Sequence, residues 1–129
     1  MSRHQMLQAA LVIFGVVFCL IYPLAIVWPS GWAWHDGPPA SSHYFMMIVG
    51  VYATLGLFLI RASRDPAANR SLIEFTIWSS VVHAVIMAVQ SYSDPMRMGH
   101  MTGDVPALVL VALVLGVLLY GGDRRTATA

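Results

Sequence analysis

Four long apolar segments constrain the fold of this chain more than any other feature. They cover about residues 5–28, 43–60, 71–92 and 105–120. Each approaches the roughly 20 residues that a helix needs to cross the hydrocarbon core of a bilayer. Strands would leave backbone hydrogen-bonding groups unpaired in lipid, so helices are expected. The sequence therefore predicts an all-α membrane protein, a single domain over residues 1–129 with four transmembrane helices in an up-and-down bundle.

The composition disfavours a water-soluble globular fold. Of the 129 residues, 58% are hydrophobic and only 10% are charged, whereas soluble domains carry about 25% charged residues. A small domain keeps much of its surface exposed, so one core does not hide this much apolar surface. The lipid bilayer is therefore the expected environment. A formal net charge of +1 gives no electrostatic basis for binding nucleic acid, which is not an expected partner.

The arginine positions predict the orientation in the membrane. One side of the predicted bundle carries six of the seven arginines, namely Arg3, Arg61, Arg64, Arg70, Arg124 and Arg125. Arg97 lies on the other side. Positive residues mark the cytoplasmic side, so both termini are expected in the cytoplasm. The expected outer end of the first segment carries a cluster of interfacial aromatic anchors, Trp28, Trp32 and Trp34.

Proline and glycine positions give further detail on the first two helices. Pro23 lies within the first apolar segment, where it removes a backbone hydrogen bond and predicts a kink. The second segment contains Gly50 and Gly56, which predict positions of close helix approach.

The third apolar segment carries an ionisable residue, His83, near the predicted middle of the bilayer. It lies about twelve residues into the segment, or roughly 18 Å along the helix axis. An ionisable group at that depth is costly and marks a candidate functional site. Helical spacing places a set of pocket candidates on one face: Thr76, Ser79, His83, Met87 and Gln90. The imidazole either bonds to a neighbouring helix or serves as a ligand- or proton-binding group, and both alternatives stay open.

Methionine and histidine residues on the outer side define a candidate metal site. Thioether and imidazole groups are ligands that copper prefers, above all Cu(I). The candidate ligands are His35, His43, His83, Met96, Met98, His100 and Met101. Haem is the alternative cofactor. The competing interpretation is that these methionines are flexible apolar residues at the interface and that His100 is solvated.

Three polar residues are predicted to cap helices. Ser71 and Glu74 have the spacing of a capping box at the start of the third helix, and Arg70 is placed to pair with Glu74. Asp104, two residues before Pro106, is expected to be the N-cap of the fourth helix. The alternatives are a functional carboxylate at Glu74 and, for Asp104, an acid at the outer rim opposite His100.

The C-terminal half carries a sequence pattern between Arg64 and about Leu115. It includes the runs Asp65-Pro-Ala, Trp78-Ser-Ser-Val-Val-His83 and Gly103-Asp104-Val-Pro-Ala-Leu. This pattern resembles an uncharacterised family of small four-helix bacterial integral membrane proteins. The resemblance implies a four-helix membrane fold and no assigned activity. The expected location is the bacterial inner membrane. The layout also looks loosely like DoxX-like proteins and the sterol-isomerase-like group, but the paired acids of the latter group are not evident here.

The sequence contains no nucleophile elbow, phosphate loop, CxxC or HExxH pattern. The expected function is a non-catalytic accessory subunit or binding module of a larger membrane assembly, with a protein partner or a second copy of the chain. One alternative is an intramembrane enzyme or carrier for a small lipophilic ligand, with its pocket around His83. The other is copper or haem binding. Whether the protein is an enzyme stays open.

Overall fold

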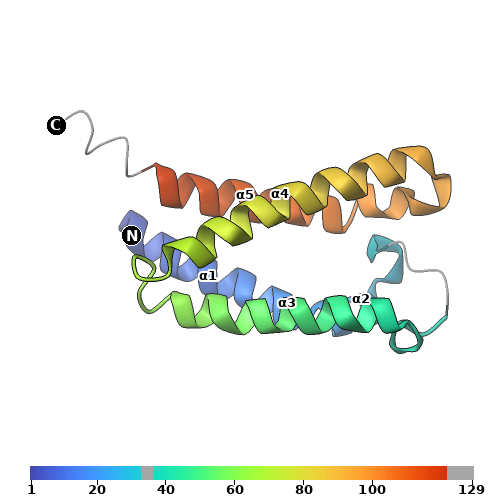
Figure 1. Ribbon diagram of the computed structural model, residues 1–129, viewed down its shortest axis with the longest axis horizontal. Coiled ribbons are helices and arrows are strands. Elements are labelled where there is room, and N and C mark those ends of the chain that lie inside the picture. The colour runs from blue at the N-terminus through green and yellow to red at the C-terminus, as the bar shows by residue number, and fades with distance from the viewer. Residues whose placement is uncertain (33–36, 122–129) are drawn as a thin grey trace.

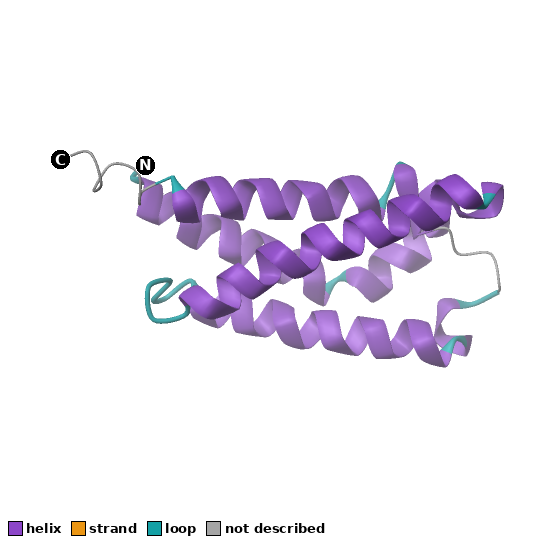
Figure 2. Cartoon of the chain, turned by 45° about the horizontal axis from the view of Figure 1, so that its top comes forward, coloured by secondary structure: helices purple, strands orange, loops and turns teal. Residues whose placement is uncertain are grey.

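The computed structural model describes residues 1–32 and 37–121, and all regular elements in these ranges are helical (Figures 1 and 2). The α-helices are α1 (Arg3–Cys19), α2 (Ile21–Val27), α3 (His43–Ala62), α4 (Arg70–Ser93) and α5 (Asp104–Tyr120). Short 3-10 helices, η1 (Pro29–Trp32), η2 (Pro39–Ser41) and η3 (Pro95–Met101), join them. Four residues named in the predictions lie outside the described ranges: Trp34, His35, Arg124 and Arg125.

Several of these helices are long and apolar enough to cross a membrane. They are α3, α4 and the segment Pro95–Tyr120, while α1 and α2 qualify together as a broken fourth span. The bounds of α3, α4 and α5 differ by at most two residues from the predicted segments. The described part of the chain thus confirms an all-helical fold with three to four candidate spans.

The first apolar segment is broken into two helices. Helix α1 ends at Cys19, and α2 begins at Ile21 with its axis bent by 60°. Pro23 explains the position of the break, because it has no N–H to donate to the carbonyl of Cys19 and its ring clashes with that carbonyl. The predicted kink is therefore present, but it interrupts the helix one turn before the proline.

The helices associate as two pairs. Helix α1 packs mainly on α3, α4 packs mainly on α5, and contacts between α1 and α5 join the two pairs. By contrast, α3 and α4 are neighbours in sequence but have few contacts with each other. Both views show α4 diverging from α3 away from the turn that connects them (Figures 1 and 2). This divergence leaves the bundle less tightly packed at the end far from the chain termini.

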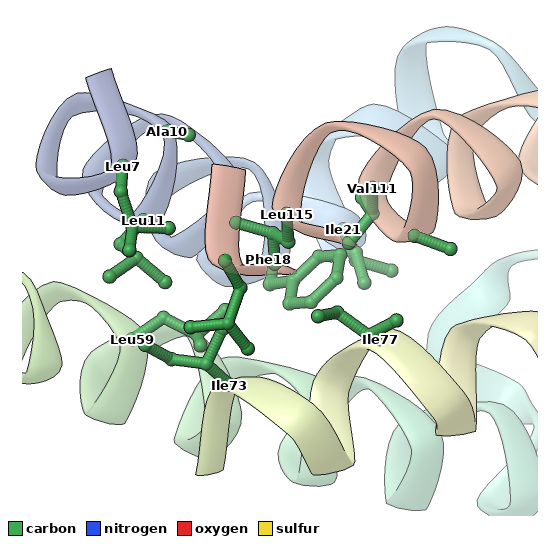
Figure 3. Packing of buried hydrophobic residues seen from close by; sticks show 12 residues of the cluster. Leu7, Ala10, Leu11, Phe18, Ile21, Leu59, Ile73, Ile77, Val111 and Leu115 are labelled. Atoms are coloured by element: carbon green, nitrogen blue, oxygen red, sulfur yellow. The ribbon is translucent and has the colours of Figure 1, made fainter. Parts of the chain in front are cut away.

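The apolar core lies toward the end where α1 begins and α5 ends. Four completely buried side chains, one from each of α1, α3, α4 and α5, meet there: Leu11, Leu59, Ile73 and Leu115 (Figure 3). Two hydrogen bonds fasten the same end. Arg3 Nη2 donates to the carbonyl of Leu119 at 3.2 Å, and Gln8 Nε2 donates to the carbonyl of Ser63 at 2.8 Å.

Helices α1 and α3 approach closely at two glycines. A Cβ atom built on Gly15 would lie 2.7 Å from the carbonyl oxygen of Gly56, and a Cβ on Gly56 would collide with the carbonyl oxygen of Gly15. The predicted close approach at Gly56 is confirmed. The prediction for Gly50 is wrong, because nothing lies within 4 Å of a Cβ built there.

The start of α4 differs from the predicted capping box. Asn69 is the N-cap residue, without a side-chain capping hydrogen bond, and Ser71 lies inside the first turn. The preceding turn is closed by its own bonds, since Asn69 Nδ2 donates to the carbonyl of Asp65 at 2.8 Å. The helix can therefore begin at Arg70. Glu74 is ion-paired with Arg70 at 3.0 Å instead of acting with Ser71, in the i,i+4 arrangement that stabilises helices.

Candidate functional site

A cavity of about 560 Å³ lies between α1, α3, α4 and α5, where it adjoins the apolar core at Phe18, Ile21 and Val111 and extends toward η3. Small-molecule sites have volumes of about 300–1,000 Å³. The wall is mainly apolar and includes Phe14, Phe18, Phe45, Met87, Leu108 and Val111. Its main polar groups are Tyr52, His83, Arg97, His100 and Asp104. The cavity therefore has the composition of a site for a small lipophilic molecule.

One polar pair on the wall joins α3 to α4. The hydroxyl of Tyr52 and Nδ1 of His83 are hydrogen-bonded at 2.5 Å. Phe18 packs edge-on against the Tyr52 ring, with 5.0 Å between centroids and an interplanar angle of 84°. With the tyrosine hydroxyl as donor, the neutral His83 ring carries its own proton on Nε2. This nitrogen and the phenolic oxygen keep hydrogen-bonding capacity for a ligand.

A second polar pair lies at the end of the cavity formed by η3 and the start of α5. His100 Nδ1 is 2.9 and 2.8 Å from the two carboxylate oxygens of Asp104. Both side chains are largely buried, with exposed fractions of 14% and 10%. The carboxylate thus binds the imidazole that precedes it by four residues. The other ring nitrogen of His100, Nε2, is a further atom that can make a hydrogen bond.

The N-cap prediction for Asp104 is wrong by one residue. Gly103 is the N-cap of α5, without a side-chain capping bond, and Asp104 is the first helical residue. The carboxylate is held by His100 and does not cap the helix. An acid in the first turn still interacts favourably with the helix dipole. The observed position agrees with the alternative interpretation, an acid at the rim next to His100.

The predicted polar face of α4 contributes only its central part to the cavity. His83 and Met87 line it. Thr76 and Ser79 donate instead to carbonyl groups of their own helix, at 2.9 and 3.3 Å, as hydroxyl residues within helices commonly do. Gln90 is exposed. Because α4 crosses the bundle at an angle, residues on one face of it meet different surroundings along its length.

The candidate metal ligands are found in dissimilar surroundings. Met96, Met98 and Met101 are exposed, as is His43 at the start of α3, and His35 lies outside the described ranges. Within residues 1–32 and 37–121, no group of three His, Cys, Asp or Glu side chains is close enough to hold a metal ion. Copper and haem binding stay predictions.

Three residues of the cavity wall were missed by the sequence interpretation. Tyr52 carried a signal, since a phenol inside an apolar segment needs a hydrogen-bond partner. Trp32 was expected only as an interfacial anchor, yet it lines the cavity, and its buried Nε1 has no partner among the described residues. Arg97 lines the cavity and pairs with Asp94 at 3.3 Å.

Comparison with known proteins identifies the family. A family model matches residues 1–128, nearly the whole chain. The chain belongs to the family described as "Family of unknown function (DUF6632)". This membership agrees with the predicted resemblance to an uncharacterised family and extends well beyond the C-terminal half. No match was found among curated proteins or among solved structures.

Proposed function

We propose that this protein is a membrane binding module that holds a small lipophilic molecule in the cavity beside His83. The observation that carries the proposal is a cavity of about 560 Å³ with an apolar wall and a few defined polar groups. This combination is the usual form of a small-molecule site, in which apolar contacts supply affinity and polar groups fix orientation.

The two polar pairs support binding over simple packing. Polar side chains inside a membrane bundle are costly and tend to be fully hydrogen-bonded when they serve packing alone. Here each pair uses one side of its imidazole ring, Nδ1 of His83 for Tyr52 and Nδ1 of His100 for Asp104. Both imidazoles also lie on the cavity wall. A ligand with a polar end would satisfy the remaining groups.

The orientation is part of the proposal. The turn between α3 and α4 contains or adjoins Arg61, Arg64 and Arg70, and it lies at the same end as the start of α1 (Figure 1). The positive-inside rule then places this end in the cytoplasm, with both termini on that side of a bacterial inner membrane. The cavity, at the opposite end, opens within the outer half of the bilayer.

Membership in a larger membrane assembly remains a separate proposal. Small size and the absence of a catalytic motif in the sequence motivate it. The protein mass in the protein–detergent particle tests this proposal directly. A protein mass larger than that of one chain supports a partner or a second copy. A strictly monomeric particle that never copurifies with another protein contradicts it, without affecting ligand binding.

Native mass spectrometry tests the binding proposal. The protein is extracted from its own membrane in mild detergent, and bound mass is released with organic solvent and identified. We expect one class of lipophilic molecule at close to one per chain. A sample that carries only detergent, and that no lipophilic alcohol, ketone or acid stabilises against heat, contradicts the proposal, because a ligand that binds the folded state raises its stability.

A further inference from the structure

A groove on the lateral surface of the bundle adjoins the cavity. It measures about 250 Å³, lies between α3 and α4, and is lined by Tyr44, Met47, Ile48, Val51, Tyr52 and His83. Four of these residues, Tyr44, Ile48, Tyr52 and His83, also line the cavity. They therefore form the wall that separates the groove from the cavity.

The groove faces the region where lipid acyl chains would lie. Met47 and Val51 are on the outer face of α3, with exposed fractions of 58% and 66%. Exposed apolar side chains of a membrane helix face lipid. Because α3 and α4 have few mutual contacts, the wall between them depends on single side chains, above all the hydrogen-bonded Tyr52 and His83.

The charged groups at the cavity are already paired. Asp104 is bonded to His100 at 2.8 Å and Arg97 to Asp94 at 3.3 Å. An anionic ligand would have to compete with the carboxylate of Asp104 for the imidazole, and like charges repel in a region of low dielectric constant. A cationic ligand would have to displace His100 from the carboxylate. An uncharged polar group meets neither obstacle.

We propose that the ligand is an uncharged amphiphile with a hydroxyl head, and that it enters sideways from the bilayer through the groove between α3 and α4. The inference rests on the proposed function, since it presupposes that the cavity binds a lipophilic molecule. A hydroxyl both donates and accepts, so it complements the Nε2–H of His83 and the phenolic oxygen of Tyr52. As it passes the wall, it takes the place of the bond between these two side chains by accepting from the Tyr52 hydroxyl and donating to Nδ1 of His83.

The other end of the cavity is less open to entry. The 3-10 helices η1 and η3 contact each other there, and Trp32 and Arg97, which they carry, both line the cavity. A lipophilic molecule entering by this path would leave the bilayer and cross the polar interface. Sideways entry keeps its apolar part in an apolar environment throughout, which avoids the cost of hydrating it.

Quenching of Trp32 fluorescence by a brominated alcohol tests the proposal. In a background with Trp28→Phe, Trp34→Phe and Trp78→Phe, Trp32 on the cavity wall is the reporter. The protein is reconstituted in phosphatidylcholine vesicles and mixed with ω-bromoundecanol in a stopped-flow instrument. The quenching phase that follows partition of the alcohol into the bilayer measures entry into the cavity.

Phenylalanine substitutions at two matched valines show whether a slower quenching phase comes from crowding of the groove or from adding a large side chain to any exposed helix face. Val51 lines the groove and Val117 lies on α5 outside both the groove and the cavity, with similar exposed fractions of 66% and 69%. We expect Val51→Phe to slow the quenching phase about tenfold by crowding the groove, and Val117→Phe to leave it within about twofold. Met47→Phe, also in the groove, is the second blocking variant if Val51→Phe does not fold.

The outcomes distinguish this inference from the proposed function. Unchanged quenching rates in both groove variants, with the equilibrium quenching intact, overturn sideways entry and leave ligand binding standing. Quenching by ω-bromoundecanoate or bromoundecane as strong as that by the alcohol, compared at equal concentration in the bilayer, overturns the hydroxyl head. If the alcohol quenches Trp32 in the folded parent protein no more than it does in the unfolded chain, the binding function itself is overturned.

Discussion

The hydroxyl of Tyr52 and Nδ1 of His83 lie 2.5 Å apart and join two helices, α3 and α4, that otherwise hardly touch. The bond lies at the wall shared by the cavity and the groove. It therefore combines two roles, since it holds the bundle together and presents polar atoms to a ligand. Interhelical hydrogen bonds in membrane proteins contribute about 0.6 kcal/mol on average and up to about 1.7 kcal/mol.

Removal of this bond is expected to weaken the bundle modestly. Tyr52→Phe should lower the free energy of unfolding by about 0.6–1.7 kcal/mol, because it deletes the hydroxyl and keeps the ring against Phe18. Unfolding in mixed micelles with increasing dodecyl sulfate measures the loss. Tyr92→Phe is the control, since Tyr92 is 91% exposed. Equal stability of the two variants would show that the bond contributes nothing to the fold.

The Gly15–Gly56 contact predicts a steep sensitivity to one methyl group. Gly56→Ala should destabilise the protein by about 1–3 kcal/mol, because the new Cβ meets the backbone of α1, which has no room to yield. Gly50→Ala on the same helix should be neutral or stabilising by up to about 1 kcal/mol, since its Cβ would meet open space. The same unfolding measurement decides, and a harmless Gly56→Ala would contradict the observed packing.

The His100–Asp104 pair should show strong energetic coupling. A double-mutant cycle with His100→Ala and Asp104→Ala is expected to give a coupling free energy of about 1–3 kcal/mol, because both side chains are largely buried. The matching cycle for Arg97 and Asp94, which are about half exposed, should give less than about 1 kcal/mol. Additive effects at His100 and Asp104 would mean that their contact does not stabilise the start of α5.

Filling the cavity should displace the ligand without unfolding the protein. Val111 lines the cavity and Val109, on the same helix, does not; their exposed fractions are 4% and 42%. Val111→Phe is expected to lower occupancy by the native ligand at least about tenfold, and Val109→Phe to preserve it. Native mass spectrometry of both variants, prepared identically, measures the occupancy. Equal occupancy would place the ligand elsewhere.

Hydropathy predicted the helical segments well and their contacts poorly. The bounds of α3, α4 and α5 follow from runs of apolar residues, which depend only on local sequence. The break between Cys19 and Ile21 was expected from Pro23, although the size of the bend depends on what α2 packs against. The capping predictions erred by two residues at Ser71 and by one at Asp104, because nearby side chains made other bonds.

The sequence predicted the candidate site only at a residue whose type is unusual for its position, an ionisable side chain in an apolar segment. His83 was recognisable because an imidazole deep in a bilayer is costly. A pocket around His83 was expected, but its partner Tyr52 and the walls contributed by the other helices were not predicted, since they depend on how far α4 diverges from α3. The His100–Asp104 pair was suspected from its position at the outer rim, but bonding across the start of α5 requires the geometry of η3. Single-helix patterns do not contain these relationships.

The concentration of fully buried residues at one end has a mechanical consequence. Four helices are fixed to one another at the end where α1 begins by Leu11, Leu59, Ile73 and Leu115. The opposite end surrounds the cavity and is held by a smaller apolar cluster, Ala84, Val105 and Leu108, together with the polar pairs. Lateral pressure in the bilayer therefore deforms the two ends unequally. Thinner or more loosely packed membranes should change the spacing of α3 and α4 at the cavity while the distance between the glycines of α1 and α3 stays constant.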